Sequence, residues 1–405
     1  MFKQSGGKYA TLLSLYLAQS IPMSFFSTVM PVIMREEAYS LTDIGLIQLI
    51  KIPWIIKFLW APFVDSTGKT TTGHRKWIIG SEIFYAIIIL SISFLNFNVD
   101  FGLIIILMLI AFTASATQDI ATDAFAILVL KKEERSTGNS IQAAGSFLGT
   151  LTGSGVLLII YHYLGWQYLL VGLAGFVVLA LLPLMFYKAK HAAPKSENVK
   201  PISMKDIGLF FKAPGNMRRV ALLAVFYSGI IGVLTMLKPY LVDLGYNKAE
   251  IGILSGVHGA AFGAAAAFIA GRILKKYGKR KCLRIFALFG FLASTYFFMM
   301  TQIEPAKYMI IFGIALLWSA YGMSSVVIYT ISMDNVREGR EGTDFTIQIV
   351  ITHLSSLIIA VSSGKVANSI GYEGLFMIEV MIGLLVLISI GKLYKEHKSI
   401  ADETR

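Results

Sequence analysis

Long apolar runs separated by short polar segments recur along nearly the whole chain. An apolar run of about 20 residues is long enough for a helix to cross a bilayer. Inside lipid a helix satisfies all its own backbone hydrogen bonds, so runs of this length predict membrane-spanning helices. We expect twelve, at residues 9–34, 42–63, 77–96, 101–128, 138–163, 167–187, 218–241, 248–273, 282–301, 306–333, 344–369 and 372–392.

One long polar connection divides the predicted helices six and six. It predicts an N-terminal bundle at 1–187, a linker at 188–217 and a C-terminal bundle with a short tail at 218–405. The two halves also share a pattern: Asp123 at the end of the fourth run precedes Gln142, and Asp334 at the end of the tenth precedes Gln348. The sequence therefore predicts an all-α membrane protein of two pseudo-symmetric six-helix bundles, with a substrate site between them.

The charge of the chain follows the same topology. Of its 405 residues, 56% are hydrophobic and 15% charged, and the net charge is +12. Such a basic balance could indicate nucleic acid, but 29 of the 36 Lys and Arg residues fall in one set of alternate segments and 3 in the other. This asymmetry predicts that both termini are cytoplasmic and that the basic side chains face anionic lipid headgroups. We expect a multi-pass protein of the inner membrane, without a nucleic-acid partner.

Several other classes of protein are disfavoured by what the sequence lacks. Cys282 is the only cysteine, which excludes an internal disulfide and a cysteine-based metal site. His258 and His353 are too far apart in sequence to suggest a metal cluster. No phosphate-binding loop of the Gly-x-x-x-x-Gly-Lys-Ser/Thr type occurs, and no convincing catalytic constellation is present. We therefore expect a transporter without cofactor or metal, rather than an enzyme or an ATP-driven pump.

Two carboxylates lie in the fourth apolar run. Asp119 and Asp123 are four residues apart, so they share one helix face. Charges at this depth are costly unless they face protein, water or a cation. Helix rise places Lys57 ~22 Å and Asp119 ~27 Å below the outer edge, which predicts a pair between the second and fourth helices. This pair either opens during proton-coupled transport or permanently fixes the two helices, and the sequence leaves both open.

The remaining candidates are single polar residues. Lys51 could attract an anionic substrate. Gln19, Gln142 and Gln348 line the cavity or bond between helices, and His258 and His353 bind substrate, carry a proton or are satisfied by hydrogen bonds. Candidates for gating are Asp65, Arg75, Arg135 and Asp334. We expect Asp65 to pair with a helix terminus or with a loop arginine such as Arg135.

Two motifs carry a family resemblance. Ala61-Pro62-Phe63-Val64-Asp65-Ser66 with His74-Arg75-Lys76 resembles the loop pattern of the major facilitator superfamily, and Gly271 to Lys281 resembles its second copy, with Lys275 where an Asp is often found. Lys57 to Asp65 together with Gln118-Asp119-Ile120-Ala121-Thr122-Asp123 is similar to the branch of muropeptide permeases, acetyl-CoA transporters and inner-membrane siderophore permeases.

The resemblance implies a secondary active transporter that works by alternating access. The segment Gly138-Asn139-Ser140-Ile141-Gln142, followed by glycines at 145, 149 and 153, favours the siderophore permeases, and hence import of a siderophore or similar small chelate. The alternatives are a cell-wall muropeptide and an acyl-CoA-like anion. We also expect a monomer. The predicted outer loops are short and form no capture domain, so we expect an outer-membrane receptor system to deliver the substrate.

Overall fold

The computed structural model describes residues 2–36, 47–187 and 202–394, and these form helices without any strand. The N-terminal half contains α1 (Phe2–Ser24), η1 (Phe25–Val29), α2 (Met30–Glu36), η2 (Ile47–Lys51), α4 (Ile52–Ile56), η3 (Lys57–Leu59), α5 (Ala61–Thr67), α6 (Thr71–Ser93), α7 (Phe101–Val129), η4 (Lys132–Glu134), α8 (Arg135–Leu151), η5 (Thr152–Val156), α9 (Leu157–Leu179) and α10 (Leu182–Phe186). The C-terminal half contains α11 (Lys205–Lys212), α12 (Asn216–Val225), α13 (Ser228–Asp243), α14 (Lys248–Ile251), η6 (Gly252–His258), α15 (Gly259–Tyr277), α16 (Lys279–Met300), α17 (Lys307–Asp334) and α18 (Glu341–Leu393).

The apolar runs form the predicted membrane helices. Among the described residues, eight helices are long and apolar enough to cross a membrane. Two of them, of 55 and 53 residues, each hold two passes, because the chain turns at Gly165 and Gly371, both with φ of 72°. The remaining passes are built from α1 to α2 and from η2 to α5, which completes twelve. The start of the predicted second run, 42–46, lies outside the described residues.

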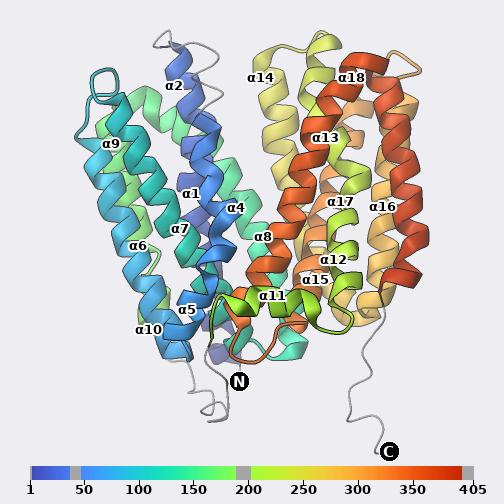
Figure 1. Ribbon diagram of the computed structural model, residues 1–405. Coiled ribbons are helices and arrows are strands. Elements are labelled where there is room, and N and C mark those ends of the chain that lie inside the picture. The colour runs from blue at the N-terminus through green and yellow to red at the C-terminus, as the bar shows by residue number, and fades with distance from the viewer. Residues whose placement is uncertain (1, 37–46, 188–201, 395–405) are drawn as a thin grey trace, which may run out of the picture.

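The helices form two bundles side by side (Figure 1). The N-terminal half buries two apolar clusters, around Phe112 and around Phe125, and the C-terminal half buries one large cluster around Phe297. Helix α8 belongs to the first half but contributes Phe147 to the core of the second. The halves therefore share a packed seam along α8 and α15.

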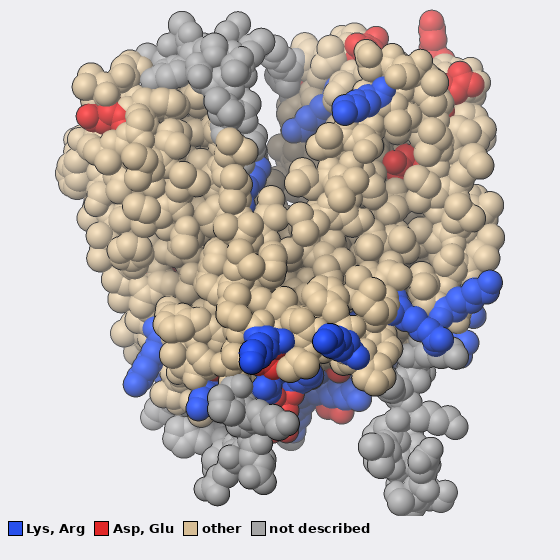
Figure 2. Space-filling model, in the orientation of Figure 1, with Lys and Arg blue, Asp and Glu red and all other residues tan. Residues whose placement is uncertain are grey.

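Lysine and arginine gather at one end of the molecule, where α1 begins and α18 ends (Figures 1 and 2). We call this the basic end. Helix α11 lies across it, between the two bundles (Figure 1). Asp206 of α11 pairs with Arg340 and with Arg337, whose guanidinium nitrogen lies 3.6 Å from the carboxylate. Burial acts to raise the pKa of Asp206, but the hydrogen bond and charge of Arg340 outweigh it and hold that pKa below its ordinary range. The end of the linker is thus tied to the segment between α17 and α18.

The glycines at 145, 149 and 153 form a close-packing surface of the fifth membrane helix against α1, and this surface gives a stability prediction. A Cβ added at Gly153 would meet the carbonyl of Ile21 and lie 2.6 Å from the Cβ of Ser24, whereas one added at Gly155 meets nothing within 4 Å. We expect Gly153→Ala to lower the free energy of unfolding by about 1–3 kcal/mol through overpacking. Gly155→Ala is the control, and it should raise that free energy by about 0.4–1 kcal/mol by restricting the unfolded chain. Thermal unfolding in detergent measures both, and equal shifts would contradict this account.

Candidate functional site

A buried ion pair joins Lys57 and Asp119. The chain between η2 and α5 is broken into short turns around Pro53, and Lys57 stands at the start of one of them. Its ammonium group contacts the Oδ2 of Asp119 in α7. Lys57 is 1% and Asp119 4% exposed, so both charges are withdrawn from water. The ring of Trp54 covers the ammonium group at 4.6 Å from its centroid. The pair expected from helix depth is therefore present as a buried contact.

Asp123 lies one turn further along α7, on the same face. Its Oδ1 accepts hydrogen bonds from the hydroxyl of Tyr16 at 3.0 Å and from the Nε2 of Gln142 at 3.1 Å. These two donors come from α1 and α8, so the carboxylate joins three helices of the N-terminal half. Asp123 is 2% exposed and faces no cation at ion-pair distance among the described residues. Hydrogen bonds, rather than a counter-charge, hold it in place.

Both carboxylates face a cavity of about 460 Å³ between the two halves. Most of its polar lining comes from the N-terminal half, and the C-terminal half adds Tyr329 and His353. Of the side chains predicted for the site, seven line the cavity: Gln19, Lys51, Lys57, Asp119, Asp123, Gln142 and His353. Figure 2 shows a hollow between the halves at the end opposite the basic end.

Several polar atoms in this lining have no partner in the described part of the chain. The side-chain oxygens of Gln19 and Gln142 are buried acceptors without a donor, and the indole nitrogen of Trp54 is a buried donor without an acceptor. Lys51 forms no ion pair with a described carboxylate. Unpaired buried polar groups are costly, so a site that presents them is suited to a ligand that supplies the missing hydrogen bonds.

At the basic end the cavity is closed by contacts that cross between the halves. The carboxylate of Asp65 in α5 accepts hydrogen bonds from the backbone nitrogen of Gly342 at 3.0 Å and from the nitrogen and hydroxyl of Thr343 at 2.6 and 2.7 Å. It thus caps the first turn of α18 from the opposite half. Arg135 at the start of α8 bonds Asp334 at the end of α17, at 2.8 Å. We call these two contacts the basic-end gate.

The three predicted gate residues Asp65, Asp334 and Arg75 differ in the contacts that they make. Asp65 binds a helix terminus, as one alternative predicted, but it does not pair with Arg135. Asp334 also contacts Lys279 at 2.5 Å, so it is shared between the halves. Arg75 does not join the halves, because it bonds the backbone oxygen of Met185 at 2.9 Å at the end of its own bundle. It is therefore not part of the basic-end gate in this structure.

Two predicted side chains lie outside the cavity lining. Gln348 donates to the backbone oxygens of Asp344 and Ser332 at 3.0 and 3.2 Å, which ties α17 to α18 near the basic end. Since α18 begins only seven residues earlier, at Glu341, Gln348 cannot reach the middle of the membrane. His258 ends the π-helical segment η6 and lies beside Phe262 instead. The wider turn rotates it away from the face that regular helical spacing implies.

Two buried groups were missed by the sequence analysis. Tyr16 is three residues before Gln19 in α1, so its place on the same helix face was the available signal. Glu379, in the last apolar run, is 2% exposed and its Oε2 has no partner among the described groups. An acidic residue in that run was itself a signal. Glu82 of α6 is also buried and does not line the cavity.

The chain is similar to known proteins in sequence and in fold. The profile of the Major Facilitator Superfamily matches residues 12–360 and 220–403. The chain belongs to the major facilitator superfamily. It is a secondary transporter, and its two bundles are the two halves of that fold.

Named relatives cover nearly the whole of this major facilitator chain. An anhydromuropeptide permease of Escherichia coli (strain K12) is 23% identical over 395 residues, which is 94% of this chain and 79% of the relative. A protein of Rickettsia conorii named putative transporter AmpG 4 is 22% identical and covers 92% of each chain. The fucose:proton symporter of Escherichia coli has the same fold, with a TM-score of 0.72 at 12% identity over 96% of this chain and 99% of that chain. So does a bacterial homologue of the iron transporter ferroportin in an outward-facing state, with a TM-score of 0.71 at 16% identity over 96% of this chain and 99% of that chain.

Proposed function

We propose that this protein imports an anhydromuropeptide-type compound, an amino sugar joined to a short peptide, across the cytoplasmic membrane together with protons. The chemistry of the cavity supports the proposal. Its lining presents amide oxygens that accept no hydrogen bond within the described chain, and a lysine that pairs with no described carboxylate. The relatives support the substrate class, because the named ones that match over the full chain include an anhydromuropeptide permease. The siderophore that the sequence motifs favour has no such support, since the likeness to a ferroportin homologue is one of fold alone.

The orientation follows from the charge distribution. We place the basic end in the cytoplasm, since lysine and arginine accumulate on that side of bacterial membrane proteins. The cavity is then closed toward the cytoplasm by Asp65, Arg135 and Asp334, and its hollow faces outward. This arrangement suits a transporter that is ready to receive substrate from outside the membrane.

The cavity offers partners for each part of such a compound. Lys51 is placed to bind a carboxylate of the peptide, because no described acidic side chain neutralises it. The amide oxygens of Gln19 and Gln142 can accept from hydroxyl or amide groups, and the indole nitrogen of Trp54 can donate. An aromatic side chain also provides an apolar surface for a sugar ring.

Proton coupling is assigned to the Lys57–Asp119 pair. A bound proton on Asp119 would neutralise that carboxylate and release the ammonium group, which breaks the link between the turn at η3 and α7. Asp123 is one turn away and already accepts two hydrogen bonds. It can stabilise the displaced lysine, so the pair can open without leaving a charge alone in the cavity.

The test is direct binding to purified protein. Titration calorimetry with a disaccharide anhydromuropeptide, a ferric siderophore and an acyl-CoA would compare the three substrate classes. We expect binding of the muropeptide alone, weakened about tenfold or more in Lys51→Gln. Lys238→Gln is the matched control, because Lys238 is also a lysine of an apolar run and lies outside the cavity lining. Binding of the siderophore without the muropeptide would reverse the substrate assignment.

A further inference from the structure

A second hollow lies on the outer surface of the N-terminal half, between α5, α6 and α7. Its volume is about 830 Å³, larger than that of the central cavity, and the two share no lining residue. Helix α7 stands between them: it presents Thr113 and Thr117 to the outer groove, and Asp119 and Asp123 to the cavity. The groove is therefore separate from the transport site.

The lining changes from polar to apolar along the groove. Near the basic end it is formed by Thr67, Thr70, Thr72 and Lys76, and further along by Gly80, Phe84 and Ile110. Phe84 is 48% and Ile110 38% exposed, so both face the lipid. From the first residue of α6 to Phe84 the helix rises ~20 Å. The groove thus runs from the headgroup level well into the hydrocarbon layer.

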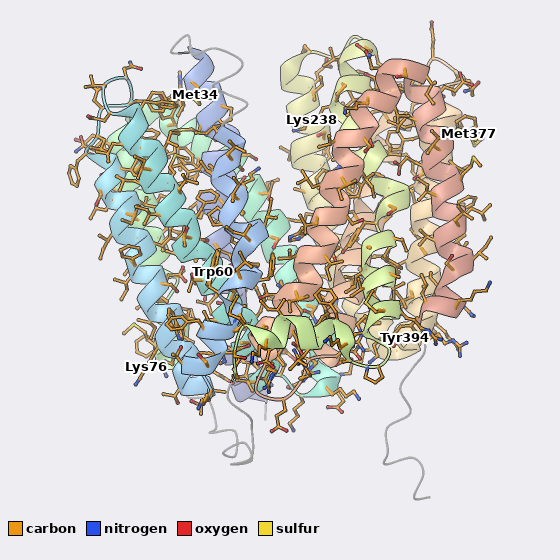
Figure 3. All side chains as sticks on the ribbon, in the orientation of Figure 1. Met34, Trp60, Lys76, Lys238, Met377 and Tyr394 are labelled. Carbon is orange, nitrogen blue, oxygen red and sulfur yellow. The ribbon has the colours of Figure 1, made fainter. Side chains whose placement is uncertain are left out.

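The charge at the polar end is unpaired within the described chain. Arg75 is occupied by backbone oxygens of the α10 region, whereas Lys76 is exposed and forms no ion pair with a described carboxylate. Figure 3 shows Lys76 at the outer edge of its half, at the basic end. Trp77 also lines this end, and its indole nitrogen bonds Thr67 at 2.8 Å. A lysine with hydroxyl groups and an interfacial tryptophan form a suitable site for a phosphate at the membrane surface.

We propose that this groove is a binding site for one anionic phospholipid. Lys76 and the hydroxyl of Thr72 receive the phosphate, and one acyl chain lies along Gly80, Phe84 and Ile110. Basic pockets between membrane helices are known means of binding anionic lipid headgroups. Lys76, which pairs with no described carboxylate, selects an anionic lipid over a zwitterionic one. The apolar length of the groove selects a lipid over a free phosphate.

A pair of glycines provides a matched test of the acyl-chain position. A Cβ at Gly80 or at Gly172 meets nothing within 4 Å, and both glycines are exposed on membrane helices of the same half. Leucine at position 80 therefore fills the groove without disturbing the protein. Leucine at position 172, outside the groove, adds the same apolar surface elsewhere. Lys275 is the matched control for the charge of Lys76, since it is also an exposed lysine at the basic end, in the other half.

The experiment is native mass spectrometry of detergent-purified protein with phosphatidylglycerol, phosphatidylcholine of the same chains, or inorganic phosphate. We expect one phosphatidylglycerol to bind at least fivefold more tightly than phosphatidylcholine, and inorganic phosphate not to bind. Lys76→Gln should remove the preference, and Gly80→Leu should remove the binding itself. Lys275→Gln and Gly172→Leu should change neither. Equal binding by Gly80→Leu and the native protein would overturn the site, and an undiminished preference in Lys76→Gln would overturn the headgroup assignment.

A labelling measurement tests the same site without relying on lost binding. Cys282 is the single cysteine and is buried, so Gly80→Cys introduces one accessible thiol. Phosphatidylglycerol should slow its reaction with an apolar maleimide at least threefold, and phosphatidylcholine should slow it less. Equal rates with and without phosphatidylglycerol would contradict the proposal.

Discussion

Asp119→Asn should abolish accumulation of substrate in proteoliposomes and lower the stability of the protein. The substitution leaves the ammonium group of Lys57, which is only 1% exposed, without its counter-charge. Breaking a buried pair in this way costs about 3–5 kcal/mol. Lys57→Gln should have a similar effect on stability, because it leaves the carboxylate of Asp119 without its counter-charge.

The double variant Lys57→Gln/Asp119→Asn separates stability from coupling. It contains no stranded charge, so thermal unfolding should return close to that of the native protein, while uptake driven by a proton gradient stays absent. A permanent structural pair predicts the opposite for uptake, which should recover together with stability. Glu250→Gln is the control for loss of an ion pair, since its partner Lys307 is 58% exposed, and neither stability nor uptake should change measurably.

Asp65→Ala should open the basic-end gate. The carboxylate receives three hydrogen bonds from Gly342 and Thr343 in the other half, and alanine leaves these donors at the start of α18 without an acceptor. Each lost charge-assisted bond is worth about 1–3 kcal/mol, so even a partial loss shifts the open population about tenfold or more.

Spin labels on Lys69→Cys and Lys276→Cys, which are exposed at the basic end of the two halves, measure this shift as a loss of the short distance between them. Arg75→Gln is the matched control, because Arg75 is another charged residue of the basic end but bonds only within its own half. Its distance distribution should stay that of the native protein. A distribution unchanged by Asp65→Ala would show that Arg135 and Asp334 close the gate without this cap.

The sequence predicted those residues of the site that are costly to place in an apolar run without a partner. A carboxylate or an ammonium group in an apolar run requires a partner wherever the helices pack, so Asp119 and Lys57 could be singled out and matched by depth. The twelve passes followed from the same principle, because lipid leaves the backbone few alternatives to a helix.

The parts that the sequence missed depend on helix rotation and on contacts between distant segments. His258 is the last residue of a π-helical turn, which no residue pattern in the sequence predicts. The sequence therefore indicated the wrong side of the helix for this side chain. Asp65 caps α18 across 277 residues of sequence, and the choice between a helix terminus and Arg135 rests on how the halves dock. Glu379 is likewise buried because α13 packs against α18, and its Oε2 then has no hydrogen-bond partner among the described residues.

The indole of Trp54 lies over the ammonium group of Lys57 and also lines the cavity. A positive charge so close to an indole alters its emission, so the native protein contains its own optical sensor. Only five tryptophans contribute to the signal, and replacing the other four by phenylalanine would leave one at the ion pair. Each opening of the pair during a transport cycle could then be followed in real time, without an attached dye.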